Sequence, residues 1–308
     1  MILLVGATGY LGRNIASQLL AKGHRVRAMT RDLTRATSLA TAGAEIVRGD
    51  VRDMESLRAA TRGVRAVVSA SHSMMGSGKS SVARVDDEGQ HSLIAAAKEA
   101  GVEHFVFLSA SGASPNHPVD FWRTKEKNER HLEASGLPYT IVRPGAFMEL
   151  HSYELIGKAV AKDKRVVLFG PGSNLRNFVA EADVARLVVL ALEDVRLRGE
   201  TIEIGGPENL SGLQVVAIFE RLTGKRARVT HLPLAALRLF SRLLSPVHEG
   251  VGRVLKAGVV GETTDQTLDP APLLARYPIK LTRLEDWARD CLARHGAESH
   301  PLQQAAEA

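Results

Sequence analysis

Three glycines at three-residue spacing follow the first apolar segment of the chain: Gly6, Gly9 and Gly12, in the stretch VGATGYLG at residues 5–12. A dinucleotide pyrophosphate is bound by backbone N–H groups at the start of a helix, so side chains must stay clear of it. In such a site the first glycine permits the tight turn, the second lets the phosphates approach, and the third lets helix and strand pack closely. The spacing differs from the more usual G-x-G-x-x-G, and the alternative is a glycine turn without a ligand. Because a predicted strand precedes the glycines and a predicted helix follows them, we favour the nucleotide site.

Two charged residues at predicted strand ends bear on which dinucleotide is bound. A second predicted strand, 24–30, ends at Arg31. NAD-binding folds usually carry an acidic residue here for the ribose hydroxyls, whereas an arginine accommodates a 2′-phosphate. We therefore predict NADP(H) in preference to NAD(H), although Asp32 is a nearby acid and the alternative is that Arg31 is a solvated loop residue. Asp50 follows a third predicted strand, 44–48, and is a candidate acceptor for the adenine amino group.

Short apolar segments alternate with segments of helical spacing along the first half of the chain. This alternation predicts an α/β fold with a Rossmann-type, doubly wound parallel sheet and ligands at the carboxyl ends of its strands. We expect an NAD(P)-binding core at residues 1–150, completed by roughly 178–206. Residues 151–308 are expected to form mainly a small, mostly helical substrate lobe, interleaved with the core. The expected strands of the core cover residues 1–5, 24–30, 44–48, 64–70, 104–108 and 137–142.

Composition is that of an ordinary soluble protein: 44% of the 308 residues are hydrophobic and 24% are charged. The net charge is +6, yet the arginines are scattered among predicted helices without aromatic interleaving, so we predict no nucleic-acid partner. The single cysteine, Cys291, excludes an internal disulfide and suits a reducing compartment. We find no apolar run long enough to span a bilayer and no basic leader before the first strand, which predicts a cytoplasmic protein without a membrane partner. No metal site is predicted.

Several motifs in a fixed order resemble one known group of proteins. The chain is similar to atypical short-chain dehydrogenases/reductases of the NmrA-like group, with extended-family traits, over residues 1 to about 225. The motifs that carry the resemblance are GATGYLG at 6–12, GD at 49–50, SAS at 109–111, Lys125, RPGAF at 143–147, FVAEADVA at 178–185 and IGGP at 204–207.

The resemblance implies a set of catalytic and cofactor-binding residues. In that superfamily a serine after the fifth strand positions the substrate carbonyl, a tyrosine donates the proton, and a lysine binds the nicotinamide ribose and lowers the tyrosine pKa. Ser111 matches the serine and Lys125 the lysine, but Phe121 stands where the tyrosine is expected. The implied cofactor-binding residues are Gly6, Thr8, Gly9, Tyr10, Leu11, Gly12, Arg31, Asp50, Val51, Ala70, Lys125, Pro144, Ala146 and Phe147.

Phenylalanine cannot donate a proton, so the source of the proton stays open at this point. One option is that Lys125 donates directly, as a lysine does in the isoflavone-reductase-like relatives that the chain resembles. The other options are water, a quinone substrate that needs less acid, or one of His72, His117, His151 and Tyr153. We predict an NADPH-dependent oxidoreductase that reduces a small carbonyl, enone or quinone compound, as a monomer or homodimer. The alternative is a non-catalytic NADP(H)-sensing regulator or assembly factor of the NmrA type.

Overall fold

The computed structural model describes residues 1–298 and divides the chain into two compact units. The first consists of residues 1–144, 181–204 and 237–260. The second consists of residues 145–180, 205–236 and 261–298. Among the described residues, no helix combines the length and the apolar character needed to cross a bilayer.

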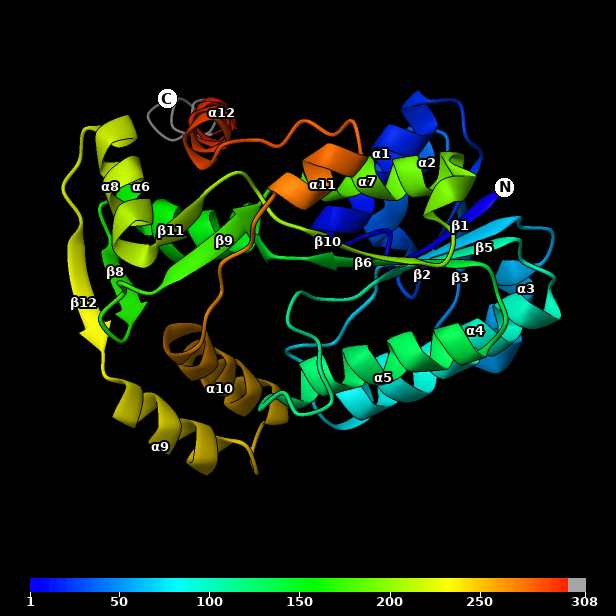
Figure 1. Cartoon of the computed structure of the whole chain (residues 1–308), viewed down its shortest axis with the longest axis horizontal. Helices are drawn as coiled ribbons and strands as arrows, with labels where there is room; N and C mark the ends of the chain where they lie inside the picture. Colours follow the sequence, from blue (N-terminus) through cyan, green and yellow to red (C-terminus); the bar gives the residue numbers. More distant parts are fainter. Residues whose placement is uncertain (299–308) are drawn as a thin grey trace, which may run out of the picture. The chain divides into compact units, whose positions relative to one another are not determined.

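A seven-stranded sheet forms the centre of the first unit (Figure 1), and all its neighbouring strands are parallel. The strand order is β10-β6-β5-β4-β1-β2-β3. The order therefore reverses between β1 and β4, where ligands bind in doubly wound folds. The prediction of a Rossmann-type α/β fold is confirmed. The strands are β1 (Ile2–Val5), β2 (Val26–Thr30), β3 (Glu45–Arg48), β4 (Ala66–Ser69), β5 (His104–Leu108), β6 (Tyr139–Pro144) and β10 (Glu200–Ile204).

Helices cover both faces of this sheet (Figure 1). One face carries α1 (Tyr10–Ala21), α2 (Thr37–Thr41) and α7 (Glu181–Glu193). The other carries α3 (Met54–Thr61), α4 (Gly89–Glu99) and α5 (Asp120–Ala134). Leu57, Leu93 and Leu132 of these last three helices are fully buried against Phe105 and Phe107 of β5. A π-helical segment, Ala83–Glu88, leads directly into α4.

The second unit contains short helices and two small sheets, ordered β11-β9-β7 and β12-β8. Its core gathers around Phe219, Tyr153 and Trp287, all at most 8% exposed. The strands are β7 (Ala146–Phe147), β8 (Arg165–Phe169), β9 (Leu175–Val179), β11 (Asn209–Ser211) and β12 (Arg228–Leu232). The helices are α6 (Lys158–Ala161), α8 (Gly212–Thr223), α11 (Ala271–Arg276) and α12 (Leu284–Glu298).

Two further helices follow β12: α9 (Leu234–Leu244) and α10 (Glu249–Thr263). Residues 237–260 of this segment belong to the first unit. On α10, Ala257 and Val260 pack against a small cluster that contains Phe121. This contact brings α10 next to the first turn of α5.

Candidate functional site

The glycine loop between β1 and α1 has a backbone shape that only glycine permits at two positions. Gly6 has φ = +86°, and a Cβ there would lie 2.7 Å from the carbonyl carbon of Ala70 and the nitrogen of Ser71. A Cβ on Gly12 would lie 2.2 Å from the carbonyl oxygen of Gly6. The first glycine therefore lets the turn touch the end of β4, and the third lets α1 pack on the turn.

Gly9 has a different environment. Gly9 is the N-cap of α1, and no side chain forms a capping hydrogen bond there. The first turn of α1 contains no acidic residue. A Cβ on Gly9 would meet one atom within 4 Å, the carbonyl oxygen of Gly6 at 3.4 Å. Tyr10 is 72% exposed, while Thr8 and Leu11 are half-buried. The N–H groups of this helix start are thus open and lack a competing anion, so the residues present fit a pyrophosphate group.

Arg31 and Asp32 follow β2 and differ in the hydrogen bonds that their side chains form. The Asp32 carboxylate accepts hydrogen bonds from the nitrogen (3.0 Å) and the hydroxyl (2.7 Å) of Thr34, which lower its pKa. Arg31 is exposed, and its positive charge contributes to lowering the pKa of Asp50. The acidic group beside Arg31 is therefore engaged within its own turn, which leaves the guanidinium as the group suited to an anion.

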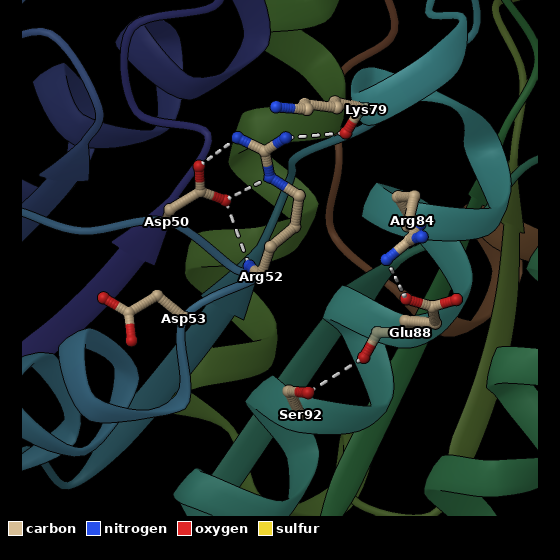
Figure 2. Close-up of a pocket in the computed structure, with 7 residues that line it drawn as sticks. All are labelled: Asp50, Arg52, Asp53, Lys79, Arg84, Glu88 and Ser92. Atoms are coloured by element: carbon tan, nitrogen blue, oxygen red, sulfur yellow. Dashed lines mark hydrogen bonds and ion pairs between the residues drawn. The ribbon is translucent and has the colours of Figure 1, made fainter.

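A pocket of about 420 Å³ lies beside Asp50 (Figure 2). Arg52 donates to the Asp50 carboxylate through Nε at 2.9 Å and Nη2 at 2.5 Å, and through Nη1 to the carbonyl oxygen of Lys79 at 2.6 Å. These hydrogen bonds hold the pKa of Asp50 below its usual range. An adenine amino group and Arg52 thus compete for one carboxylate. Val51 is 7% exposed and belongs to the core, so its backbone is the part that can face a ligand.

Lys125 lies in the interior of the first unit, at 3% exposure. Its Nζ donates to the carbonyl oxygen of Leu108, the last residue of β5, at 2.9 Å. The rings of Phe107 and Phe121 have their centres 4.8 and 5.4 Å from Nζ. Phe121 and Lys125 are four residues apart on α5, so they share one face of the helix. Burial lowers the pKa of Lys125, and the negative charge of Asp86 is the largest opposing influence.

Ser111 is held at the same sheet edge by three contacts. Its hydroxyl donates to Glu203 Oε1 of β10 at 2.6 Å, and its carbonyl oxygen accepts from the indole nitrogen of Trp122 at 2.9 Å. Its backbone nitrogen donates to the carbonyl oxygen of Pro144 at 2.9 Å. The structure therefore brings together Ser111, Pro144 and the first turn of α5. In this arrangement the Ser111 hydroxyl uses its hydrogen in the bond to Glu203.

Ser109 and Asp86 are two buried polar residues to which the sequence analysis assigned no role. Ser109 directly follows Leu108, is 6% exposed, and its hydroxyl has no partner among the described residues. Asp86 is 4% exposed and accepts from the backbone nitrogen of Ser73 at 2.8 Å. Burial raises the pKa of Asp86 to about 6. The signal for Ser109 is a serine directly after an apolar strand, and the signal for Asp86 is an acid next to Val85 near the start of a helical segment.

Comparison with known proteins decides the family. A sequence profile of the NmrA-like family matches residues 1–283. The chain belongs to the NmrA-like family. It is 29% identical over 302 residues to photosystem II assembly factor Ycf39 of Synechocystis sp., covering 95% of this chain and 91% of that protein. It is 31% identical over 237 residues to an NAD(P)H azoreductase of Xenophilus azovorans, covering 76% and 78%.

Solved structures show the same fold for this NmrA-like chain. An NADPH-dependent quinone oxidoreductase from Escherichia coli, complexed with NADPH, superposes with a TM-score of 0.76 at 24% identity, covering 95% of this chain and 100% of the other. The curated relatives of this chain include an azoreductase and an assembly factor.

Two histidines named as proton donors lie in the first unit of the NmrA-like chain. The ring of His72 is edge-on to that of Phe121 with centres 5.9 Å apart. His117 stacks on Trp122 at 4.8 Å, and its Nδ1 accepts from the backbone nitrogen of Val119 at 3.1 Å. Of these two, His72 is therefore the one beside Phe121.

The remaining predicted residues lie in the second unit. Ala146 and Phe147 form β7, which pairs in parallel with β9. Nδ1 of His151 lies 3.2 Å from the carbonyl oxygen of Phe147, and burial lowers its pKa to about 4, so the imidazole is neutral at pH 7. Tyr153 is 6% exposed and its ring packs near that of Phe219. The surroundings of Tyr153 are those of a core residue.

Proposed function

We propose that this protein is an NADPH-dependent oxidoreductase that reduces a small carbonyl, enone or quinone compound. The observation that carries the proposal is the position of Lys125, a buried ammonium group tied to the last residue of β5. β5 and β1 are parallel strands of one sheet, so Leu108 at the end of β5 and the glycine loop after β1 lie at the same edge of that sheet. A buried cation at that edge is typical of a catalytic centre rather than of a solvated helix surface.

Each residue of the proposed site has a distinct task. The glycine loop and the start of α1 bind the pyrophosphate, Arg31 binds the 2′-phosphate, and Asp50 contacts the adenine. Lys125 binds the nicotinamide ribose, and Ser111 contacts the substrate oxygen after its hydroxyl turns away from Glu203. When bound, the reduced nicotinamide supplies a hydride to the electrophilic carbon of the substrate.

Lys125 is also the proposed proton donor. Phe121 occupies the position where a tyrosine would act, and its ring offers no acidic hydrogen. Burial makes the Lys125 ammonium more acidic than an exposed lysine, which brings its pKa closer to the pH at which the reaction runs. The ammonium therefore loses its proton to the substrate oxygen more readily than an exposed lysine does.

The test measures NADPH oxidation against a panel that includes menadione, cinnamaldehyde, benzaldehyde and cyclohexanone. Lys125→Met removes the ammonium but keeps an unbranched side chain. Lys127→Met, on the same helix but with an exposed side chain paired to Asp87, is the matched control. We expect turnover of at least one compound that Lys125→Met abolishes and Lys127→Met leaves unchanged. Equal activity of all three proteins would overturn the assignment.

The second candidate is a non-catalytic NADP(H)-sensing regulator or assembly factor. Phe121 favours it, because its buried ring stands where the family's proton donor is expected. The similarity to Ycf39 supports it as well. Tight NADPH binding without turnover of any panel compound favours this candidate over the reductase.

A further inference from the structure

Four buried polar atoms have no hydrogen-bond partner among the described residues: Asp86 Oδ1, Gln90 Nε2, Ser109 Oγ and Asn128 Oδ1. They lie on α5, on the two helical segments that contact it and on the residue after Leu108, to which Lys125 donates. Asp86 and Gln90 are four residues apart on one continuous helical segment, and Lys125 and Asn128 are three apart on α5. Asn128 Nδ2 donates to the backbone oxygen of Asp86 at 2.6 Å, which joins the two segments. Buried polar groups without a partner are rare in folded proteins and call for a functional explanation.

The negative charges of Asp86 and Glu129 both raise the pKa of Lys125, and Glu129 already has an ion-pair partner. Glu129 accepts from Arg143 through both carboxylate oxygens, at 2.9 Å from Nε and 2.5 Å from Nη2. Asp86 has no ion pair with Lys125 within 4.0 Å among residues 1–298, and its Oδ1 is unpartnered. Of the two acids, Asp86 is therefore the one whose charge acts mainly on Lys125.

The other charged groups around Asp86 are also paired with one another. Arg253 of α10 donates to both carboxylate oxygens of Asp120, at 2.8 and 3.0 Å. Their charges act on the Asp86 carboxyl with opposite signs, Arg253 lowering and Asp120 raising its pKa, and Lys125 lowers it more than either. Desolvation of the ring, with a smaller contribution from the charge of Lys125, lowers the pKa of His72 to about 4, so this imidazole is not a second cation beside Asp86. Lys125 and Asp86 are thus the two opposite charges in this interior that have no ion-pair partner within 4.0 Å among the described residues.

We propose that Asp86 is a positioning residue for the reduction, and that the negative charge of its carboxylate keeps Lys125 in the ammonium form from which the proton is delivered. The inference rests on the proposed reductase function. The hydride and its electron pair reach the substrate carbon from the reduced nicotinamide. The N–H bond of Lys125 breaks, an O–H bond forms on the substrate, and the resulting neutral amine regains a proton from solvent. Without Asp86, the buried amine has less tendency to regain it.

The test compares three variants with the wild type: Asp86→Asn, Asp86→Glu and the matched control Asp87→Asn. Asparagine keeps the shape and can still accept from Ser73, whereas glutamate keeps the charge. Asp87 adjoins Asp86 in sequence, but its side chain pairs with Lys127. NMR titration of the Lys125 side-chain nitrogen in the cofactor-free protein is one readout. The pH profile of kcat, with the fastest compound of the panel as substrate, is the other.

We expect Asp86→Asn to lower the pKa of Lys125 by about one unit, because an opposite charge is lost. The alkaline limb of kcat should move to lower pH by the same amount, with KM changed less than twofold. Asp86→Glu should restore both readouts in part, and Asp87→Asn should move neither. An unchanged Lys125 pKa in Asp86→Asn overturns the inference. If the wild type turns over no panel compound, the reductase proposal fails, and the titration still decides whether Asp86 controls Lys125.

Discussion

Substitutions at Gly9 and Gly12 are expected to separate cofactor binding from stability, although both glycines belong to one motif. Gly9 has φ = −75° and ψ = 167°, a conformation open to any residue, and a Cβ there would make an ordinary contact at 3.4 Å. A Cβ on Gly12 would lie 2.2 Å from the carbonyl oxygen of Gly6 and 2.8 Å from the Cα of Ala7. Both of these are backbone atoms, which cannot rotate away.

These distances set the expected magnitudes. Overpacking at Gly12→Ala should cost about 1–3 kcal/mol of unfolding free energy, and each kcal/mol lowers the unfolding temperature by roughly 2–4 °C in a large domain. Gly9→Val should cost about 1 kcal/mol or less, because a poorer N-cap is all that the fold loses. Its branched side chain covers the N–H groups of the first turn of α1. Losing two charge-assisted hydrogen bonds should weaken NADPH binding by more than about 100-fold.

Fluorescence titration with NADPH and thermal unfolding followed by circular dichroism measure the two effects on each variant. Gly9→Val is expected to unfold close to the wild-type temperature and to lose binding. Gly12→Ala is expected to unfold at a clearly lower temperature. Wild-type affinity in Gly9→Val would refute the placement of the pyrophosphate, and wild-type unfolding of Gly12→Ala would refute the packing argument.

Three further predictions address single side chains. Arg31→Ala should weaken NADPH binding about 10- to 100-fold and spare NADH, with Arg25→Ala at the opposite end of β2 as control; equal losses for both dinucleotides would argue against a 2′-phosphate contact. Burial raises the pKa of Cys291 from 9.0 to about 11, so the native thiol should react with Ellman's reagent far more slowly than the unfolded one. Between pH 9 and about 11 the folded state keeps the thiol proton of Cys291, whereas the unfolded state releases it. The unfolding free energy should therefore fall by about 2–3 kcal/mol as the pH rises through this range, and a flat profile would contradict the burial. Arg253→Met should lower urea stability by about 1–3 kcal/mol, less than for a fully buried pair because Asp120 is half-exposed, and an unchanged midpoint would show that the pair contributes nothing.

The sheet of the first unit can be predicted from sequence because its strands are short apolar runs between turn residues. In a parallel sheet with helices on both faces, such runs are buried on both sides and need no alternation. β1, β4 and β5 are buried at every position. β7 and β11 are different, since strands of two and three residues carry no readable period.

The sequence by itself determined the parallel α/β fold, the glycine loop and the presence of charged residues at strand ends. These features depend on local spacing, and the carboxyl ends of parallel strands necessarily meet at one edge. Only the tertiary structure decided which side chains act on one another there. The Ser111 hydroxyl is bound by Glu203, which lies 92 residues away in the chain. Asp86 lies against the helix of Lys125, where Asn128 donates to its backbone oxygen, because two helical segments pack on the same side of the sheet. Packing of that kind has no local pattern in the sequence.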